Sequence, residues 1–484
     1  MALGLHFKFS SVAEDVRAAL EEVSLLGWDG SPVAATVEYG DGRLSVTGER
    51  HQSGALQITW PVAPVGRRRL QTASLMAQDA PYRLAVELAR GHINLVSNQA
   101  AEWDLAGLRP SPESLELLRS AKQRLGRAIR TDDEAAATRE AEQALEEAIL
   151  CGERLTGEYS RQAIASRRRR FGMRSQLACC YDESFLSLED PEFLRRLFDG
   201  VTIEPDWSRL EPECGRRDWG SLDRAVEWCL DRDFIVAIGP VVDLRPGRLP
   251  DWVVAESNHE TQLVWMLDLV ETCVQRYGER VKDWEATQGG NGPDGVGLSE
   301  ARRMAITARL GEAIREMDGE ARIALGIDRP WGDRPRRAER SQRTPFDYAD
   351  QMLRADAPVQ ALSLEIAIGY GERGSAQRGA LEFVQLLDRY RELESPLRVR
   401  LFHPSRRPGE LEDAGAVGEA AQADWLENYV AAALAKPFVE RVTWGRYMDR
   451  PGAMWPDSGL LDESGRPKRA LKRLRAVRRA CFRP

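Results

Sequence analysis

Residues 171–484 consist of eight short, largely apolar runs separated by longer amphipathic stretches, and this alternation restricts the fold more than any other feature. Short apolar runs predict buried strands, whereas apolar positions spaced about 3.6 residues apart predict helices. Eight strand and helix pairs over about 310 residues are typical of a (β/α)8 barrel with insertions. The predicted strands cover residues 177–181, 200–203, 234–239, 281–288, 322–327, 360–367, 397–403 and 439–445.

A doubly wound open sheet is the competing α/β fold. It typically carries a glycine-rich phosphate-binding turn after its first strand, but neither GxGxxG nor GxxxxGK[ST] follows residues 177–181. We therefore predict that residues 171–484 form a (β/α)8 TIM barrel.

The first 170 residues differ from the rest in their pattern. Residues 1–78 alternate apolar and polar positions in short segments broken by glycine turns, which predicts a β-rich N-terminal domain. Residues 79–170 have helical spacing and predict a helical connector. The arginines at 167–170 end its last helix, and a solvated helix end explains them better than an anion or nucleic-acid site.

Composition excludes several classes. The chain has 76 acidic and 68 basic residues, a net charge of −8, which argues against a nucleic-acid partner, and no run approaches the about 20 apolar residues of a membrane span. Seven scattered cysteines without a CxxC pair and five histidines without HExxH spacing predict no disulfide framework, metal or cofactor. The N-terminal residues have no secretory pattern, so we expect a cytoplasmic location.

Several motifs of the predicted barrel occur in an order that is itself informative. The second strand gives T-I-E-P at 202–205, followed by Trp207 and L-E-P at 210–212. Further matches are L-P-D-W-V at 249–253, V-K-D-W-E at 281–285, T-W-G at 443–445 with Asp449 and Trp455, G-L-L-D at 459–462 and P-K-R-A at 467–470. Together these segments resemble glycoside hydrolase family 10, the endo-β-1,4-xylanases.

The resemblance implies a barrel that binds an oligosaccharide or polysaccharide, but the chain departs from the family at its catalytic positions. When the family motifs are aligned with this sequence, Gln288 stands at the family's Asn and Gly289 at its acid/base Glu. Leu401 stands at the family's nucleophilic Glu. Retaining hydrolysis needs two carboxyl groups about 5–5.5 Å apart, and neither Gly nor Leu provides one. We therefore expect that the family's mechanism is not inherited.

Acidic residues at other strand ends are the remaining candidates for chemistry, because barrel active sites lie at the carboxyl ends of the strands. Glu204 and Glu365 are the candidate catalytic pair, since like charges in one cleft raise a carboxyl pKa. An ion pair between Glu365 and an arginine such as Arg400 is the alternative, and we favour it. The acidic residues predicted at the barrel mouth are Glu204, Asp243, Glu285, Asp328, Glu365 and Asp449.

Aromatic and polar side chains near the same ends are candidates for sugar contacts, because indole faces stack on pyranose rings. The predicted substrate-binding residues are Glu204, Asp243, Gln288, His403, Trp444, Asp449 and Trp455. A core position is the alternative for Trp444, and His403 is a candidate general base or a structural residue. The basic loop 331–337 suits an acidic or sulfated sugar, but a solvated loop is the interpretation we favour. The glycine-rich stretch 287–293 predicts a flexible loop that brings backbone N–H groups close to a ligand, although glycine loops are common.

Three functions follow from these observations. Carbohydrate recognition without hydrolysis is the leading hypothesis, and a glycoside hydrolase with relocated carboxylates is the second. A scaffold that assembles through its N-terminal domain is the third. The oligomeric state stays open.

Overall fold

The computed structural model describes residues 3–9, 20, 23–27, 32–40, 42–48, 53–63, 65–188, 190–333, 343–371, 374–406 and 418–482. These residues form two compact units. The first contains the residues up to Ser166 together with 376–385, and the second contains most of the chain from Arg167 onward. Residues 334–337 of the basic loop lie outside the described residues.

The first unit contains two small sheets, as its alternating sequence predicts. One has the order β4-β5-β1-β9, and the other has the order β3-β2-β6-β7 with β8 paired to β6. In the first sheet β1 runs antiparallel to β5 and parallel to β9. The strands are β1 (Leu3–Lys8), β2 (Ser24–Leu26), β3 (Pro32–Val33), β4 (Ala35–Gly40), β5 (Arg43–Gly48), β6 (Ser53–Val62), β7 (Gly66–Gln71), β8 (Leu75–Met76) and β9 (Tyr82–Arg83).

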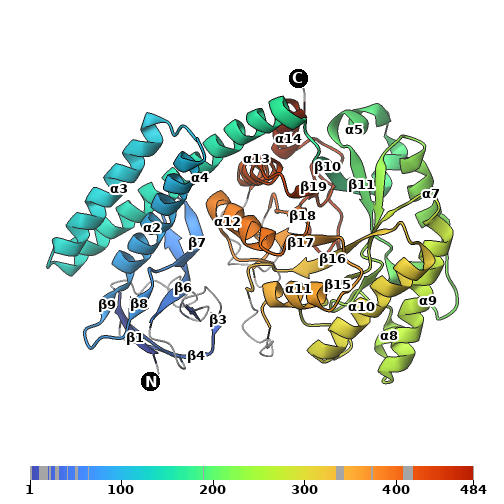
Figure 1. The fold of residues 1–484 in the computed structure, drawn as a ribbon, viewed down its shortest axis with the longest axis horizontal. Coiled ribbons are helices and arrows are strands. Elements are labelled where there is room, and N and C mark those ends of the chain that lie inside the picture. Colours follow the sequence, from blue (N-terminus) through green and yellow to red (C-terminus); the bar gives the residue numbers. More distant parts are fainter. Residues whose placement is uncertain are drawn as a thin grey trace. The chain divides into compact units, whose positions relative to one another are not determined.

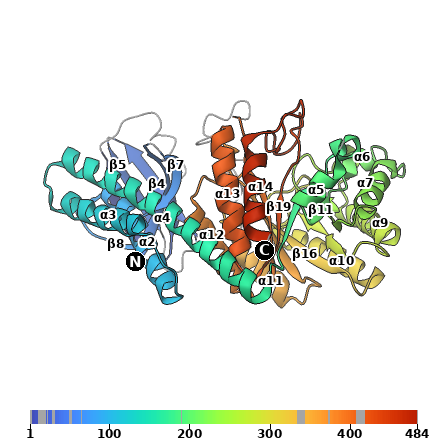
Figure 2. The ribbon, with the colours of Figure 1, turned by 90° about the horizontal axis from the view of Figure 1, so that it is seen from above.

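Three long helices share one hydrophobic core with these sheets: α2 (Leu84–Leu105), α3 (Pro112–Arg130) and α4 (Glu134–Phe171). Figures 1 and 2 show them grouped beside the strands. The face of α4 that enters the core carries alanines at helical spacing, including Ala141, Ala144 and Ala148, which lets neighbouring helices approach closely.

The second unit is a closed barrel of eight parallel strands, in the order β10-β11-β12-β14-β16-β17-β18-β19. The last strand pairs with the first, with Thr443 opposite Ala178, and this pairing closes the ring. The strands are β10 (Gln176–Cys180), β11 (Gly200–Ile203), β12 (Ile235–Ile238), β14 (Asp283–Glu285), β16 (Arg322–Asp328), β17 (Ala361–Ala367), β18 (Leu397–Phe402) and β19 (Val439–Trp444). Each coincides with one of the eight predicted runs, so the predicted barrel is confirmed.

Helices surround the barrel (Figure 1). The longer ones are α7 (Gly220–Leu230), α9 (His259–Tyr277), α10 (Glu300–Met317), α11 (Pro345–Arg354), α12 (Ala380–Arg391), α13 (Glu419–Ala435) and α14 (Arg469–Phe482), with short α5 (Pro191–Leu197), α6 (Trp207–Leu210) and α8 (Asp251–Val254). A two-stranded addition, β13 (Val242–Asp243) with β15 (Thr287–Gln288), follows β12 and β14 at the barrel mouth. Within the described ranges, no helix combines the length and apolar character needed to cross a membrane.

Candidate functional site in the barrel interior

Charged side chains occupy the interior of this barrel, a place that bulky aliphatic residues usually fill. Strands β14 and β18 are not neighbours, so a contact between their side chains must cross the interior. Arg398 of β18 donates to Asp283 of β14 at 2.7 Å, and Arg400 donates to Glu285 at 3.3 Å. Alternate residues of both strands therefore face inward.

The alternation along β18 bears on the position matched to the family nucleophile. Because Arg398 and Arg400 face the interior, Leu401 faces the surrounding helices, where it is fully buried. The motif comparison placed Leu401 at the nucleophile, but the inward-facing residues beside it are Arg400 and Phe402. Neither carries a carboxyl group, so β18 brings no acid to the interior.

The first charged layer is centred on Asp283. Its carboxylate accepts from Arg398 at 2.7 Å and from Arg441 of β19 at 2.9 Å. Burial opposes the charge of Asp283, but the two guanidinium groups hold its pKa below the usual range. Burial lowers the pKa of Arg441 to about 10 despite the contact with Asp283. Arg398 also donates to Glu440 at 2.6 Å, so this layer is an ion cluster in which two arginines share Asp283 and a second carboxylate supports one of them.

The second charged layer is centred on Arg400. Its guanidinium lies 3.1 Å from Glu204, 3.3 Å from Glu285 and 3.6 Å from Glu365. Burial opposes this charge too, but the carboxylates of Glu285 and Glu204 raise the pKa of Arg400 above its ordinary value. For Glu285, burial raises the pKa in spite of the nearby arginine.

A second arginine, Arg245, lies in the loop after β13 and joins the mouth carboxylates. It contacts Asp243 at 2.7 Å, Asp328 at 3.3 Å and Glu365 at 2.5 Å. Arg248 adds a further contact to Asp243 at 2.9 Å. The cluster therefore fills the mouth of the barrel with paired charges.

Glu365 has a strongly raised pKa. Burial raises its pKa to about 7, against the opposite influence of Arg245 and Arg400, and the charge of Asp328 adds to the rise. The indole N–H of Trp455 donates to the same carboxyl group at 3.3 Å. The predicted ion pair with Arg400 is present, and the contact with Arg245 is shorter.

The two candidate catalytic carboxyls lie near each other. Glu204 and Glu365 each place an oxygen against the same Nη1 atom of Arg400, at 3.1 and 3.6 Å. Those two oxygens are therefore at most about 7 Å apart, a limit that includes the carboxyl separation of retaining glycosidases, about 5–5.5 Å, and reaches only the lower end of that of inverting ones, about 6.5–9.5 Å. The side chain of Glu204 is 27% exposed, whereas that of Glu365 is 6% exposed.

The remaining predicted sugar-binding residues are buried. Gln288 donates to Asp328 at 2.6 Å, and Asp449 is held by Lys468 and by the backbone N–H of Gly459. Asp243 is held by Arg245 and Arg248, as described above. None of these polar groups lies free at the surface.

The side chains of Trp444 and His403 lie in the core between the strands and the surrounding helices, against Trp425 of α13. Trp444 has no exposed surface, its indole N–H donates to the carbonyl of Ser458 at 2.9 Å, and its ring meets Trp425 of α13 edge to face. His403 is buried beside the same Trp425, with Nδ1 3.0 Å from the carbonyl of Pro404. The structure thus places Trp444 in the core position that the sequence left as its alternative, because its side chain points away from the barrel interior.

Sequence reasoning named Arg400 as a partner of Glu365 but missed the other charged residues that organise this site. Asp283, Arg398 and Arg441 were not candidates, and Arg245 was not considered. A usable signal was present in the strands, since L-R-V-R-L-F at 397–402 puts an arginine at every second position of a buried run. In the part of the chain that the structure describes, no group of three or more His, Cys, Asp or Glu residues is arranged to hold a metal ion.

The fold and the interior together define a (β/α)8 barrel with an ionic core, and known proteins resemble it only distantly. No protein-family model and no curated protein matches the chain significantly. Among solved structures, xylanase 10B from Thermotoga maritima is similar at 18% identity, covering 66% of this chain and 97% of that one, with a TM-score of 0.47.

Two further similar structures come from the same group of enzymes. Xylanase 10B from Thermotoga petrophila in complex with xylobiose is 17% identical over 65% of this chain and 95% of that one, with a TM-score of 0.47. A psychrophilic glycoside hydrolase family 10 endo-β-1,4-xylanase is 15% identical over 62% and 96%, with the same TM-score. These are members of the family that the motifs resemble, while the barrel itself is established by the pairing of its strands.

Proposed function

We propose that the mouth of this barrel binds a carbohydrate and does not hydrolyse it by the family 10 mechanism. The observation that carries the proposal is the difference in exposure among the carboxylates that contact Arg400. Glu204, which matches a sugar-contacting Glu of the family motif, is the partly exposed carboxylate of the Arg400 cluster, while its partners Glu285 and Glu365 are buried.

The neutralised carboxylates support binding over hydrolysis. Glu285 is held by Arg400, and Glu365 is held by both Arg245 and Arg400. Both carboxyl groups are already engaged by guanidinium groups, so either group must break an ion pair before it attacks a sugar or accepts a proton. Glu204, held on one side by Arg400, keeps room to accept hydrogen bonds from sugar hydroxyls.

The test is a binding measurement combined with a product measurement. The purified chain is titrated with xylo-oligosaccharides and with other plant and algal oligosaccharides, and heat of binding, thermal shift and released sugar are recorded together. We expect binding without release. Glu204→Gln should weaken binding about tenfold, because it removes a charge-assisted hydrogen bond, whereas Glu227→Gln, an exposed glutamate of α7, should bind like wild type.

Two outcomes contradict this proposal. Failure of every oligosaccharide to bind removes the carbohydrate function. Release of product that is lost in both Glu204→Gln and Glu365→Gln instead supports the second candidate, a hydrolase with relocated carboxylates. That candidate draws on the elevated pKa of Glu365, about 7, which suits a proton donor near neutral pH.

A further inference from the structure

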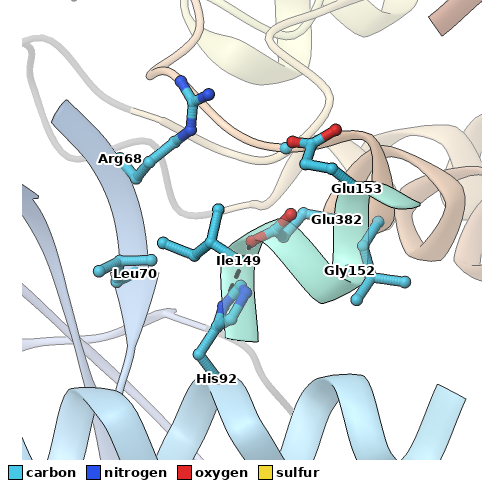
Figure 3. Close-up of a pocket in the computed structure, with 9 residues that line it drawn as sticks. Arg68, Leu70, His92, Ile149, Gly152, Glu153 and Glu382 are labelled. Carbon is cyan, nitrogen blue, oxygen red and sulfur yellow. Dashed lines mark ion pairs between the residues drawn. The ribbon is translucent and has the colours of Figure 1, made fainter. Parts of the chain in front are cut away.

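A partly buried charged cluster in the first unit is formed by residues other than the carboxylates and arginines of the barrel interior. It lines a small cavity of about 10 Å³ and combines side chains from four elements. Arg68 comes from β7, His92 from α2, Glu153 from α4 and Glu382 from α12. Figure 3 shows His92 directed toward Glu382, with Glu153 beside them.

Segment 376–385, which supplies Glu382 to the cluster, is far in sequence from the other residues of the cluster. It lies between β17 and β18 but belongs to the first compact unit. Three contacts anchor it there: the backbone N–H of Arg69 donates to Gln377 at 2.8 Å, the N–H of Ala380 to Glu153 at 3.3 Å, and His92 lies 3.7 Å from Glu382.

Glu153 is close to the first turn of α12. A Cβ atom built on Gly379 would lie 2.6 Å from a carboxyl oxygen of Glu153 and 2.8 Å from one of Glu382. The lack of a side chain at 379 therefore lets two carboxyl groups approach the same helix end. Gly152 similarly lies against Leu381, so α4 and segment 376–385 are in direct contact.

The positive charges around Glu153 do not offset the factors that disfavour its ionised form. Arg68 favours its ionised form, and so does the N–H of Ala380, but burial and the carboxylate of Glu382 oppose ionisation and raise its pKa to about 7. The nearby His92 does not supply a second positive charge, because burial lowers its pKa below the ordinary value of 6.5, although Glu382 acts in the opposite direction.

We propose that Glu153 is a pH-dependent latch that holds segment 376–385 in the first unit when protonated and loosens it when ionised. Protonation takes one proton from solvent and removes a buried negative charge beside Glu382. Loss of that proton restores like-charge repulsion between the two carboxylates, in a cavity too small for more than about one water molecule.

The size of the effect follows from proton linkage. With the pKa at the ordinary value of 4.5 when the segment is undocked and about 7 when it is docked, the docking equilibrium weakens about tenfold between pH 6 and pH 8. Docking weakens as pH rises because the carboxyl pKa is raised in the docked state. The docked state therefore binds more protons than the undocked state and loses stability when those protons are removed.

Hydrogen exchange of the full-length chain tests the proposal. Protection of the amides in segment 376–385 is measured at pH 6 and pH 8, with exchange times matched to the intrinsic rates. We expect wild type to lose protection about tenfold over this interval, and Glu153→Gln to show no such loss. Glu158→Gln is the matched control, because Glu158 is a buried glutamate of the same helix that binds Ser111 and Ser114 instead. It should behave like wild type.

A second variant keeps the test decisive if Glu153→Gln folds poorly. Glu382→Gln removes the like charge, so the pH at which protection falls should move to a lower value. Protection that is independent of pH in wild type overturns the proposal. So does a loss of protection that persists in Glu153→Gln, or a midpoint that Glu382→Gln leaves unchanged.

Discussion

Replacing Glu365 by Gln tests whether the barrel interior holds a carboxyl group that is protonated near neutral pH. The substitution keeps the shape of the side chain and removes its titration. Glu365 is 6% exposed, and burial raises its pKa to about 7 from the ordinary value of 4.5. The difference corresponds to about 3 kcal/mol of differential stability between the two protonation states.

The sign of the effect follows from which state binds the proton. Because the folded chain binds a proton at Glu365 more tightly than the unfolded chain, wild-type stability falls as pH rises from 4.5 through 7. Gln cannot lose a proton, so the variant lacks this contribution. Relative to wild type, Glu365→Gln should therefore gain about 3 kcal/mol in free energy of unfolding between pH 4 and pH 8.

Urea unfolding at several pH values provides the assay. Tryptophan fluorescence reports mainly on the barrel, because ten of the thirteen tryptophans lie between Trp207 and Trp455. Glu227→Gln serves as the exposed control and should track wild type at every pH. A stability difference that stays constant with pH, or one that moves against the variant as pH rises, would refute the reasoning. It would mean that Arg245 and Arg400 keep Glu365 ionised, and that Glu365 is no proton donor.

Two further substitutions test the buried ion pairs of the barrel. Asp283→Asn leaves Arg398 and Arg441 without their shared carboxylate and should lower the free energy of unfolding by about 3–5 kcal/mol. Adding Arg441→Met to this variant should recover part of the lost stability in a double-mutant cycle. If the effects of the two substitutions were fully additive, the shared pairing would be contradicted. Lys468→Met leaves the buried carboxylate of Asp449 without its cation, so the variant should have a lower free energy of unfolding than wild type in thermal melts at pH 7; equal stability of the two proteins would contradict this.

The sequence by itself determined the repeated part of the fold. Eight apolar runs separated by helical stretches specify eight buried strands, and each strand of the barrel lies within its predicted run or extends at most one residue beyond it. Periodicity is a local property, because burial of one strand face or one helix face is recorded in neighbouring residues. The β-rich beginning of the chain and the helices that follow were predicted for the same reason.

Only the tertiary structure decided which charges meet. Arg245 and Glu365 are 120 positions apart, and Arg400 and Glu204 are 196 apart, yet closure of the barrel brings both pairs into contact. It also decided that Leu401 faces outward. Whether a carboxyl group is protonated depends on burial and on partners from distant strands, and neither is recorded in local sequence. For that reason the sequence pointed to Glu204, to Glu365 and to a pairing of Glu365 with Arg400, whereas only the folded barrel brought Arg245 to Glu365 and Arg400 to Glu204.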